Sequence, residues 1–292
     1  MDDQDLTSIL FSVQVTKSEK NREYWATRPW ISSDLVNVVR SLDVFVLPWE
    51  EFREGHGPVV WCNLDLDLLN QTLTSLHGRG QSIYSAAYIM PPPAFGKERK
   101  HSNHLALLSR MMVDRLPDRL RQAPDLKTVY EHILAYPGLG PFLAFQYAID
   151  LNYSELLDFD ESAFVVAGPG ALDGISKCFI ETNGRSAEWL IRWVTERQSI
   201  EFAKRGLSFN GLFGRPLQPI DCQNLFCEVS KYTRVVHPEL QGNAKRQRIK
   251  QAYKKNQRPL APLAFPPRWK LDCDSLELPV TDPMPPYQPS LL

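Results

Sequence analysis

The sequence predicts a mainly α-helical protein. Apolar residues recur at intervals of three and four in several segments, and the two clearest of these flank a turn at Pro137–Gly140. Strand signals are few, the most compact being the run Phe164–Val166. A hydrophobic content of 43% over 292 residues is enough for a sizeable core, in one large domain or two small ones.

The expected helices are separated by Gly and Pro residues along the chain. Pro91–Pro93 ends one helix abruptly, and Gly78–Gly80 forms a turn after another. Residues 201–214 are expected to form mostly loop. The expected helices cover residues 64–76, 82–90, 103–116, a short stretch to about 121, 129–135, 142–151, 172–179, 186–197 and 219 to about 233.

Composition divides the chain into three parts. Residues 1–60 are rich in Trp and are expected to form an N-terminal layer packed on the main domain, residues 61–245. Residues 246–292 begin basic and become Pro-rich from about Pro259, which is typical of an extended tail.

The 33 basic and 34 acidic residues nearly balance, so any attraction to nucleic acid must come from local patches. We expect an intracellular protein without membrane contact, because no apolar run reaches the length of a span and Met1–Asp5 is too acidic to begin a secretory signal. The compartment would be the cytoplasm in a bacterium or virus and the nucleus in a eukaryote. The five scattered Cys fit a reducing environment. The Cys and His spacings match no metal motif, so we expect no metal, no cofactor and a monomer.

The turn Pro137-Gly138-Leu139-Gly140 is the strongest functional signal. Its two glycines permit positive φ and a close approach of the backbone to another molecule. The amides at the start of the following helix are suited to binding a phosphate. A carboxylate, Asp160, follows twenty-three residues after Pro137. Such a turn also occurs as an ordinary connector, and an Asp often only caps a helix.

The hairpin Tyr136–Gly140 together with Asp160 resembles the helix-hairpin-helix DNA glycosylases. In that family a Leu-Pro-Gly-(Val/Ile)-Gly hairpin grips the DNA backbone, and a catalytic Asp follows at this spacing at the start of another helix. Tyr136 here replaces the Leu, and Phe142 stands where lyase-competent members carry a Lys, which implies a water nucleophile. The resemblance implies a helical, glycosylase-like fold with a DNA-binding cleft. It makes Asp160 the catalytic residue that stabilises an oxocarbenium-like sugar and orients the water.

A second signal lies in the segment Asp221–His237. On a helix its polar residues share one face, while Cys222, Leu225, Phe226 and Val229 lie toward a face that can be buried. Amide side chains can read base edges through paired donors and acceptors, which favours a base pocket. A solvated surface face is the alternative. The predicted base-pocket residues are Asp221, Gln223, Asn224, Glu228, Lys231 and Tyr232.

The runs Ile220–Val229, Tyr136–Ala144 and Phe164–Ala171 resemble a small family of DNA-base-modification proteins. These are the alpha-glutamyl/putrescinyl-thymine pyrophosphorylases, or 5-hydroxymethyl-deoxyuridine DNA kinase helical domain. The resemblance covers roughly residues 20–255 and implies action on hypermodified pyrimidines in DNA, with a relationship to the hairpin glycosylases. The associated kinase chemistry needs a P-loop, and no GxxxxGK[ST] occurs in the chain. We therefore do not expect this chain to be the kinase itself.

Basic residues follow the segment Asp221–His237. We predict that a run without acidic residues lies along DNA phosphates, with a solvated charge run as the alternative. A second basic cluster follows the three prolines and is expected to border the same cleft; it consists of Lys97, Arg99, Lys100 and His101. The predicted backbone-binding residues are those of the hairpin, Pro137, Gly138, Leu139 and Gly140, and those of the run, Lys245, Arg246, Arg248 and Lys250.

Three functions are considered. The first, which we favour because the spacing to Asp160 has a chemical purpose, is a monofunctional DNA glycosylase. It would flip a 5-substituted pyrimidine and hydrolyse its N-glycosidic bond, in DNA repair or phage defence. The second is a pyrophosphorylase that replaces a pyrophosphoryl group on a 5-hydroxymethyl pyrimidine with an amine, with Gly168, Gly170 and Lys177 as the phosphate turn. The third is a non-catalytic reader of modified DNA.

Overall fold

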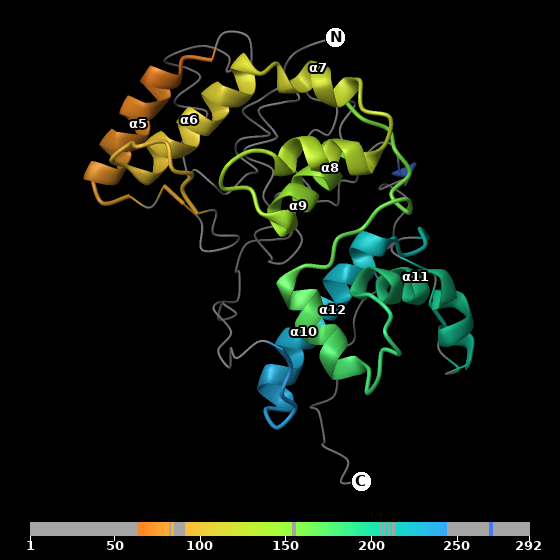
Figure 1. Cartoon of the computed structure of the whole chain (residues 1–292). Helices are drawn as coiled ribbons and strands as arrows, with labels where there is room; N and C mark the ends of the chain where they lie inside the picture. The colour runs from red at the N-terminus through yellow and green to blue at the C-terminus, as the bar shows by residue number, and fades with distance from the viewer. Residues whose placement is uncertain are drawn as a thin grey trace.

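The computed structural model describes residues 64–81, 83–84, 91–153, 156–204, 206, 208–209, 211, 214–243 and 269–270. Within these residues the chain forms α-helices and no strand, so the mainly helical fold is confirmed (Figure 1). The strand expected at Phe164–Val166 is wrong, and Val165 is instead buried in the core as part of an irregular segment. The helices are α5 (Leu66–Gly78), α6 (Lys100–Val113), α7 (Leu116–Arg121), α8 (Leu126–Leu134), α9 (Pro141–Asn152), α10 (Pro169–Cys178), α11 (Ala187–Lys204) and α12 (Pro219–Val236).

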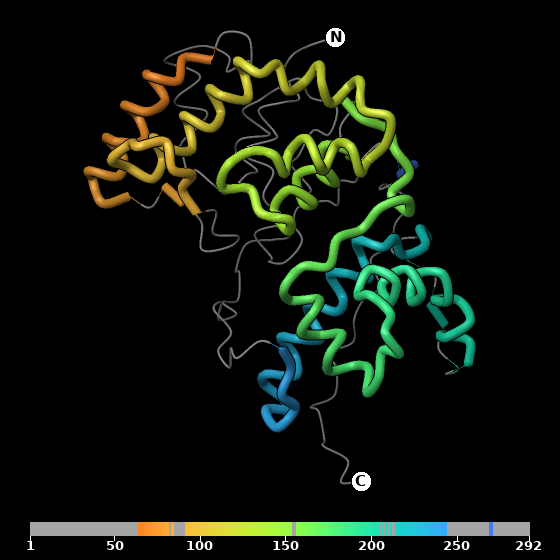
Figure 2. The backbone as a smooth tube through the Cα atoms, viewed as in Figure 1, coloured from red at the N-terminus to blue at the C-terminus, as the bar shows by residue number. Residues whose placement is uncertain are grey.

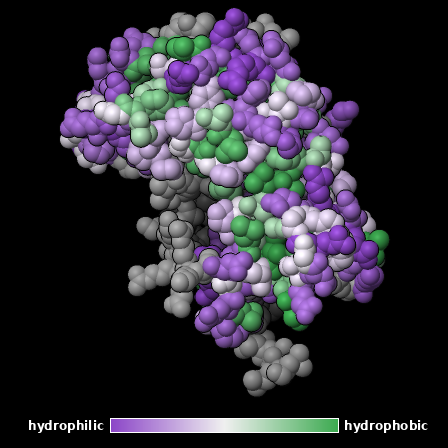
Figure 3. Space-filling model, viewed as in Figure 1, coloured by the Kyte–Doolittle hydropathy of each residue, from purple (hydrophilic) through white to green (hydrophobic). Residues whose placement is uncertain are grey.

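The helices lie in two groups, α5 to α9 and α10 to α12, which are the upper and lower parts of Figures 1 and 2. Among the described helices, the segment between α9 and α10 joins the first group to the second. Hydrophilic residues cover most of the face seen in Figure 3, and hydrophobic ones gather in smaller patches. No helix in the part of the chain that the structure describes is long and apolar enough to span a membrane.

The loop before α6 is fixed by one buried amide side chain. Asn103 accepts hydrogen bonds from the backbone N–H groups of Phe95 and Lys97, both at 3.1 Å. Its Nδ2 donates to the carbonyl oxygens of Lys97 and Arg99 at 2.7 and 2.8 Å. All four of these hydrogen bonds join the Asn103 amide to the backbone, so this one side chain holds the loop in a fixed conformation.

The hairpin between α8 and α9 is anchored by two buried side chains. Asp125 begins α8 by accepting a hydrogen bond from the Thr128 N–H at 2.7 Å. Beyond the helix, Tyr136 and Leu139 are buried, and the Tyr136 hydroxyl donates to Asp114 at 3.2 Å. Burial, and then Asp114, raise the pKa of Tyr136 to about 12. The turn therefore has a buried side that locks it and an outer side that remains exposed.

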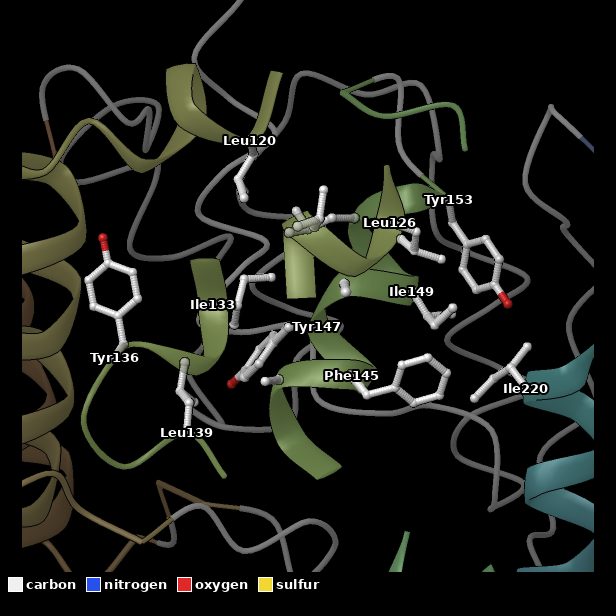
Figure 4. Close-up of a cluster of buried hydrophobic side chains, with 14 of the residues drawn as sticks. Leu120, Leu126, Ile133, Tyr136, Leu139, Phe145, Tyr147, Ile149, Tyr153 and Ile220 are labelled. Carbon is white, nitrogen blue, oxygen red and sulfur yellow. The ribbon is translucent and has the colours of Figure 1, made fainter. Parts of the chain in front are cut away.

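The core is continuous around α8 and α9. Figure 4 shows Leu126, Ile133, Phe145 and Tyr147 among the buried side chains of this cluster, and Ile220 of α12 belongs to it as well. α9 is buried on most of its surface, which explains why it is apolar around nearly its whole circumference. A helix of this kind can hold a turn at its N-terminus in a fixed position.

Helices α10 and α12 form the most extensive helix pair of the described residues, and glycines make this approach possible. A Cβ added at Gly174 would lie 1.9 Å from the Phe226 carbonyl oxygen, and one at Gly170 would lie 2.4 Å from Cys227 Sγ. Gly170 and Gly174 are four residues apart and so lie on the same helix face. Only glycine at these positions allows α12 to pack this closely.

Helix α11 extends through Lys204 and so contradicts the expectation of loop from residue 201. Gln198 stabilises this part by accepting from the Leu217 N–H at 2.8 Å and donating to the Leu217 carbonyl oxygen at 3.0 Å. The burial pattern expected for α12 is also partly wrong, because Leu225 is exposed and Gln223 is buried in its place. The polar Gln223 is tolerated there because its side chain is hydrogen-bonded.

Several predicted parts lie outside the described residues. These are most of the expected helix 82–90, the N-terminal layer 1–60 and the basic run Lys245, Arg246, Arg248 and Lys250. Of the predicted tail, Trp269 is described. Its indole Nε1–H donates to Glu161 at 3.2 Å, and its ring packs edge-on against Tyr153. This position of the tail therefore packs against the helical core.

Candidate nucleic-acid interface

The outer side of the hairpin is formed by Pro137, Gly138 and Gly140, all exposed. Gly138 has a φ of +85°, and a Cβ added there would lie 3.1 Å from the Pro93 Cβ, so the turn needs glycine for both its conformation and its contact. Gly140 precedes α9 with φ −80°, and a Cβ added there would meet no atom within 4 Å. The protein itself thus leaves the space beside Gly140 open.

A second helix N-terminus lies beside the first. Gly168 precedes α10, and a Cβ added to it would lie 2.5 Å from Cδ2 of Phe142, a residue of the first turn of α9. The Gly168 N–H donates to Gln223 Oε1 at 3.3 Å, and the same side chain donates to Asn224 Oδ1 at 2.9 Å. The starts of α9 and α10 and the first part of α12 therefore meet around Gly168.

The structure places Asp160 in a turn and not at the start of a helix, since α10 begins at Pro169. The carboxylate is exposed, and its oxygens accept from Ser162 N–H and Ser162 Oγ–H, both at 2.8 Å. The backbone of Asp160 also accepts from the Ala163 N–H at 3.2 Å. These hydrogen bonds are those of a local side-chain turn.

The neighbouring carboxylate, Glu161, belongs to a buried charged cluster. Arg215 donates to Glu161 Oε2 at 2.7 Å and to Asp221 Oδ2 at 3.3 Å, and its guanidinium lies 4.2 Å from the centre of the Trp269 ring. Asp221 also accepts from the Gln218 N–H at 2.8 Å, which completes the cap of α12. Burial raises the pKa of Asp221. The predicted base-pocket residue Asp221 thus stabilises the start of α12 and the junction with Glu161.

Lys177, predicted to receive a phosphate with Gly168 and Gly170, lies in the last turn of α10, at the opposite end from Gly168. Its side chain is 3% exposed and pairs with Asp173 at 3.2 Å, and it also donates to Thr233 at 3.1 Å. Gly170 contacts Cys227, so the predicted phosphate turn is not one cluster in space.

The remaining predicted base-pocket residues lie on α12 with different exposures. Glu228 and Tyr232 are exposed, Lys231 is half-buried, and Lys231 pairs with Glu228 at 3.0 Å. Asn224 is half-buried and hydrogen-bonded to Gln223. Together they form a polar strip along α12 that begins near Gly168.

Pro93, four residues before Lys97 of the second basic cluster, lies beside Gly138 of the hairpin. Lys97 and Arg99 lie on the loop that Asn103 fixes, and the Lys100 ammonium lies 4.3 Å from the centre of the Tyr84 ring. Burial lowers the pKa of Lys100.

In the described part of the chain no group of three His, Cys, Asp or Glu side chains could hold a metal ion.

Sequence reasoning missed the residues of α11 that hold the connecting segment. Arg192 donates to the carbonyl oxygens of Ser162 and Ala163, at 3.2 and 2.5 Å, and Glu188 accepts from the Ala167 N–H at 3.0 Å. The segment from Asp160 to Gly168 is therefore positioned by α11. The spacing of four between Glu188 and Arg192 places both on one helix face, which is the signal that could have revealed them.

The described part of the chain is mainly helical, with two adjoining helix N-termini and an exposed Gly-bearing hairpin. The sequence model of one family, described as 5-hmdU DNA kinase, helical domain, matches residues 45–242, well over half of the chain. The chain therefore belongs to this family. No curated protein and no solved structure gave a significant match.

This membership corrects the function favoured from the sequence. A family described as a DNA kinase domain points to phosphotransfer on a modified pyrimidine, so the prediction of a monofunctional glycosylase that hydrolyses the N-glycosidic bond is wrong. The finding is closer to the alternative in which chemistry takes place at the 5-hydroxymethyl group. The error came from the spacing between Pro137 and Asp160, which sequence alone cannot distinguish from a local turn such as Asp160 makes with Ser162.

Proposed function

We propose that this chain is the DNA-binding, helical part of a phosphotransferase that acts on the 5-hydroxymethyl group of 5-hydroxymethyl-deoxyuridine in DNA. The family match over residues 45–242 carries this proposal, since it includes the hairpin, the start of α10 and the whole of α12. The hydroxyl of a 5-hydroxymethyl group, which thymine lacks, is the natural acceptor of a phosphoryl group.

The hairpin supports a role in binding the DNA backbone, as a helix-hairpin-helix element. Tyr136 and Leu139 anchor the turn, while Pro137, Gly138 and Gly140 face outward at the positive end of the α9 dipole. The open space beside Gly140 leaves room for a phosphate to approach the backbone closely.

The surroundings of the hairpin support a longer DNA-binding surface. The start of α10 at Gly168 adjoins the first turn of α9, so two helix dipoles favour negative charge in one region. We include in this surface the loop with Lys97 and Arg99 and the polar strip of α12. The basic run Lys245, Arg246, Arg248 and Lys250 follows α12 in sequence and would extend the contact to phosphates. The chain acts as a monomer in this proposal.

The phosphoryl donor must be bound without a P-loop of this chain, because GxxxxGK[ST] does not occur in the 292 residues. The proposal therefore assigns to this chain the recognition of the DNA and of its hydroxymethyl group. Catalysis of phosphotransfer involves mainly positioning and charge stabilisation, so a domain that fixes the acceptor contributes directly to the rate.

The test measures binding and phosphotransfer with the full chain. Fluorescence anisotropy would compare duplexes that are identical except for thymine or 5-hydroxymethyluracil, and transfer of label from γ-labelled ATP to each duplex would be followed in parallel. Tighter binding of the hydroxymethyl duplex supports the proposal, with or without label transfer by the chain alone. Equal affinity for both duplexes together with no label transfer would overturn it.

The hairpin can be tested at Gly140 with a matched pair of variants. Gly140→Asp and Gly140→Ser both place a good cap before α9, so both variants should fold at least as stably as the wild type. The carboxylate of Gly140→Asp would repel a phosphate, and we expect roughly tenfold weaker DNA binding than for Gly140→Ser. Equal binding by the two variants would exclude the hairpin from the interface.

A further inference from the structure

Helix α11 carries a row of alternating cationic and aromatic contacts. Arg185, just before the helix, and Trp189, Trp193 and Arg197 within it are spaced by four residues. The Arg185 guanidinium lies 4.7 Å from the centre of the Trp189 ring, and that of Arg197 lies 5.2 Å from the centre of Trp193. The two indole rings are nearly parallel, with an interplanar angle of 21° and ring centroids 6.4 Å apart. We call these four residues the Arg–Trp row.

The Arg–Trp row is not part of the hydrophobic core. Of the 18 residues of α11, Leu190 and Ile191 are buried, whereas Trp189 is 40% exposed and Arg185 is exposed. A half-exposed Trp leaves hydrophobic ring surface in water, at a free-energy cost proportional to the exposed apolar area. Ile180, next to the Phe179 ring that contacts Trp193, is fully exposed as well. This surface is therefore aromatic, apolar and positively charged at once.

The row lies beside the surface proposed to bind DNA. Glu188 and Arg192 hold the segment that joins Asp160 to Gly168, and Trp189 and Trp193 each follow one of them directly along α11. Successive helical residues are turned by about 100° from one another, so the row faces the side next to that segment. DNA bound at the start of α10 would reach the row by continuing along α11.

We propose that the Arg–Trp row binds the unpaired bases of a single DNA strand by stacking. An indole ring and a guanidinium plane each accept any base on an exposed face, and the guanidinium charge also binds the phosphates between bases. An apolar protein partner fits less well, because it would remove the exposed Arg185 guanidinium from water without neutralising its charge. The inference rests on the proposed function, since an enzyme that takes its target base out of the duplex leaves neighbouring bases unpaired.

The two arginines are expected to contribute unequally. Arg197 is paired with Glu201 at 3.1 Å, so part of its charge is already neutralised. Arg185 lies over Trp189 with an exposed side chain. Arg185 and Trp189 should therefore form the stronger end of the row.

The experiment measures the affinity of the full chain for a labelled oligothymidine by fluorescence anisotropy. We expect Trp189→Ala to weaken binding roughly five- to one-hundred-fold, the range measured for loss of one base-stacking aromatic. Trp189→Phe keeps a stacking ring and should retain most of the affinity. Arg185→Ala should reduce the slope of log affinity against log salt by about 0.7. Ile200→Ala, at an exposed apolar residue of the same helix, is the control and should bind as the wild type does.

Intrinsic fluorescence gives a second readout that does not depend on the stability of an Ala variant. Addition of oligothymidine should decrease the tryptophan fluorescence. The part of this decrease that comes from Trp189 is the difference between the wild type and Trp189→Phe. Unchanged affinity in Trp189→Ala, or no quench from Trp189, would overturn the proposal that the row binds single-stranded DNA. The proposed function would still stand if Gly140→Asp weakens duplex binding. Absence of binding to any DNA would overturn both.

Discussion

Glycine serves opposite purposes in the hairpin and in the α10–α12 pair. Gly140 faces open space, and an added Cβ would touch no protein atom, whereas a Cβ at Gly174 would lie 1.9 Å from the Phe226 carbonyl oxygen. The first position leaves room for another molecule, and the second brings two helices of the same chain together. A Gly in a sequence therefore indicates a close approach, but only its surroundings show whether a ligand or a neighbouring helix makes that approach.

The upper and lower groups of helices also bury polar groups in different ways. Around α6 the buried Asn103 and His104 are uncharged groups bonded mainly to backbone and to Tyr84. Between α10 and α12 the buried groups include ions, with Asp173 accepting from Lys177 at 3.2 Å and Arg234 at 3.4 Å. A buried ion that has lost its partner destabilises the fold more than a buried neutral group that has lost one hydrogen bond. The lower helices should therefore be the more sensitive to loss of one partner.

The largest effect is expected for Asp173→Asn. Asp173 is fully buried, and loss of its charge leaves Lys177 and Arg234 without their shared counter-ion, which we expect to lower the free energy of unfolding by about 3–5 kcal/mol. Urea unfolding followed by circular dichroism measures this. Glu228→Gln removes one partner of an exposed pair with Lys231 and should cost less than about 1 kcal/mol. Equal losses in the two variants would contradict the contrast between buried and exposed pairs.

The next largest effect separates the two kinds of glycine. Gly174→Ala forces α10 away from the α12 backbone and should destabilise the protein by about 3 kcal/mol. Gly140→Ala meets no atom and should cost at most about 1 kcal/mol, mainly as a poorer cap. Thermal unfolding of both variants is the measurement, and a Gly140→Ala protein as unstable as Gly174→Ala would show that the hairpin glycine has a packing role.

The buried histidine of α6 predicts a stability change with pH. Burial first, with Lys100 and His101 adding to it, lowers the pKa of His104 from 6.5 to about 4, while its Nε2 contacts the Pro91 carbonyl oxygen. A depressed pKa means that its contribution to stability is complete above pH 6.5 and is lost as the pH falls toward 4. We expect this loss to be about 2–3 kcal/mol.

Urea midpoints measured between pH 7 and pH 4 would show this loss. His104→Gln removes the titrating group and should flatten the profile, whereas His77→Gln, at an exposed position of α5, should leave it unchanged. A profile that is just as steep in His104→Gln would assign the pH dependence to other groups.

The smallest expected effect is at the anchor of the hairpin. Tyr136→Phe keeps the buried ring but removes the hydrogen bond to Asp114, and it should cost about 1 kcal/mol. Tyr232→Phe, on the exposed part of α12, serves as the control with an expected change near zero. If Tyr136→Phe also weakens binding to DNA, the anchor positions the turn and does not merely stabilise it.

Local sequence was sufficient to predict most helices and the hairpin. The Pro at the start of α9 and the glycines before it are signals that depend on backbone geometry alone. The apolar period likewise predicted a helix over residues 129–135, and Val129 and Ile133 of α8 lie in the core.

The sequence could not show how the candidate interface is arranged, because the positions of its residues depend on tertiary contacts. Gln223 was expected in a base pocket, yet it is buried and holds the N–H of Gly168, fifty-five residues away in sequence. Lys177 was expected at a phosphate, yet the proximity of α12 pairs it with Asp173 and Thr233. The Arg–Trp row was overlooked because a spacing of four is common on any helix, and only exposure distinguishes a binding row from a core stripe.

The sequence by itself determined a mainly helical chain, a Gly-bearing hairpin between two helices and the family to which residues 45–242 belong. These follow from backbone preferences and from motifs that are contiguous in the chain. Only the tertiary structure decided which glycines face outward and which charges are buried, as Gly140 and Asp173 show. The reason is that exposure and ion pairing depend on which helices pack together, and that packing joins residues far apart in sequence.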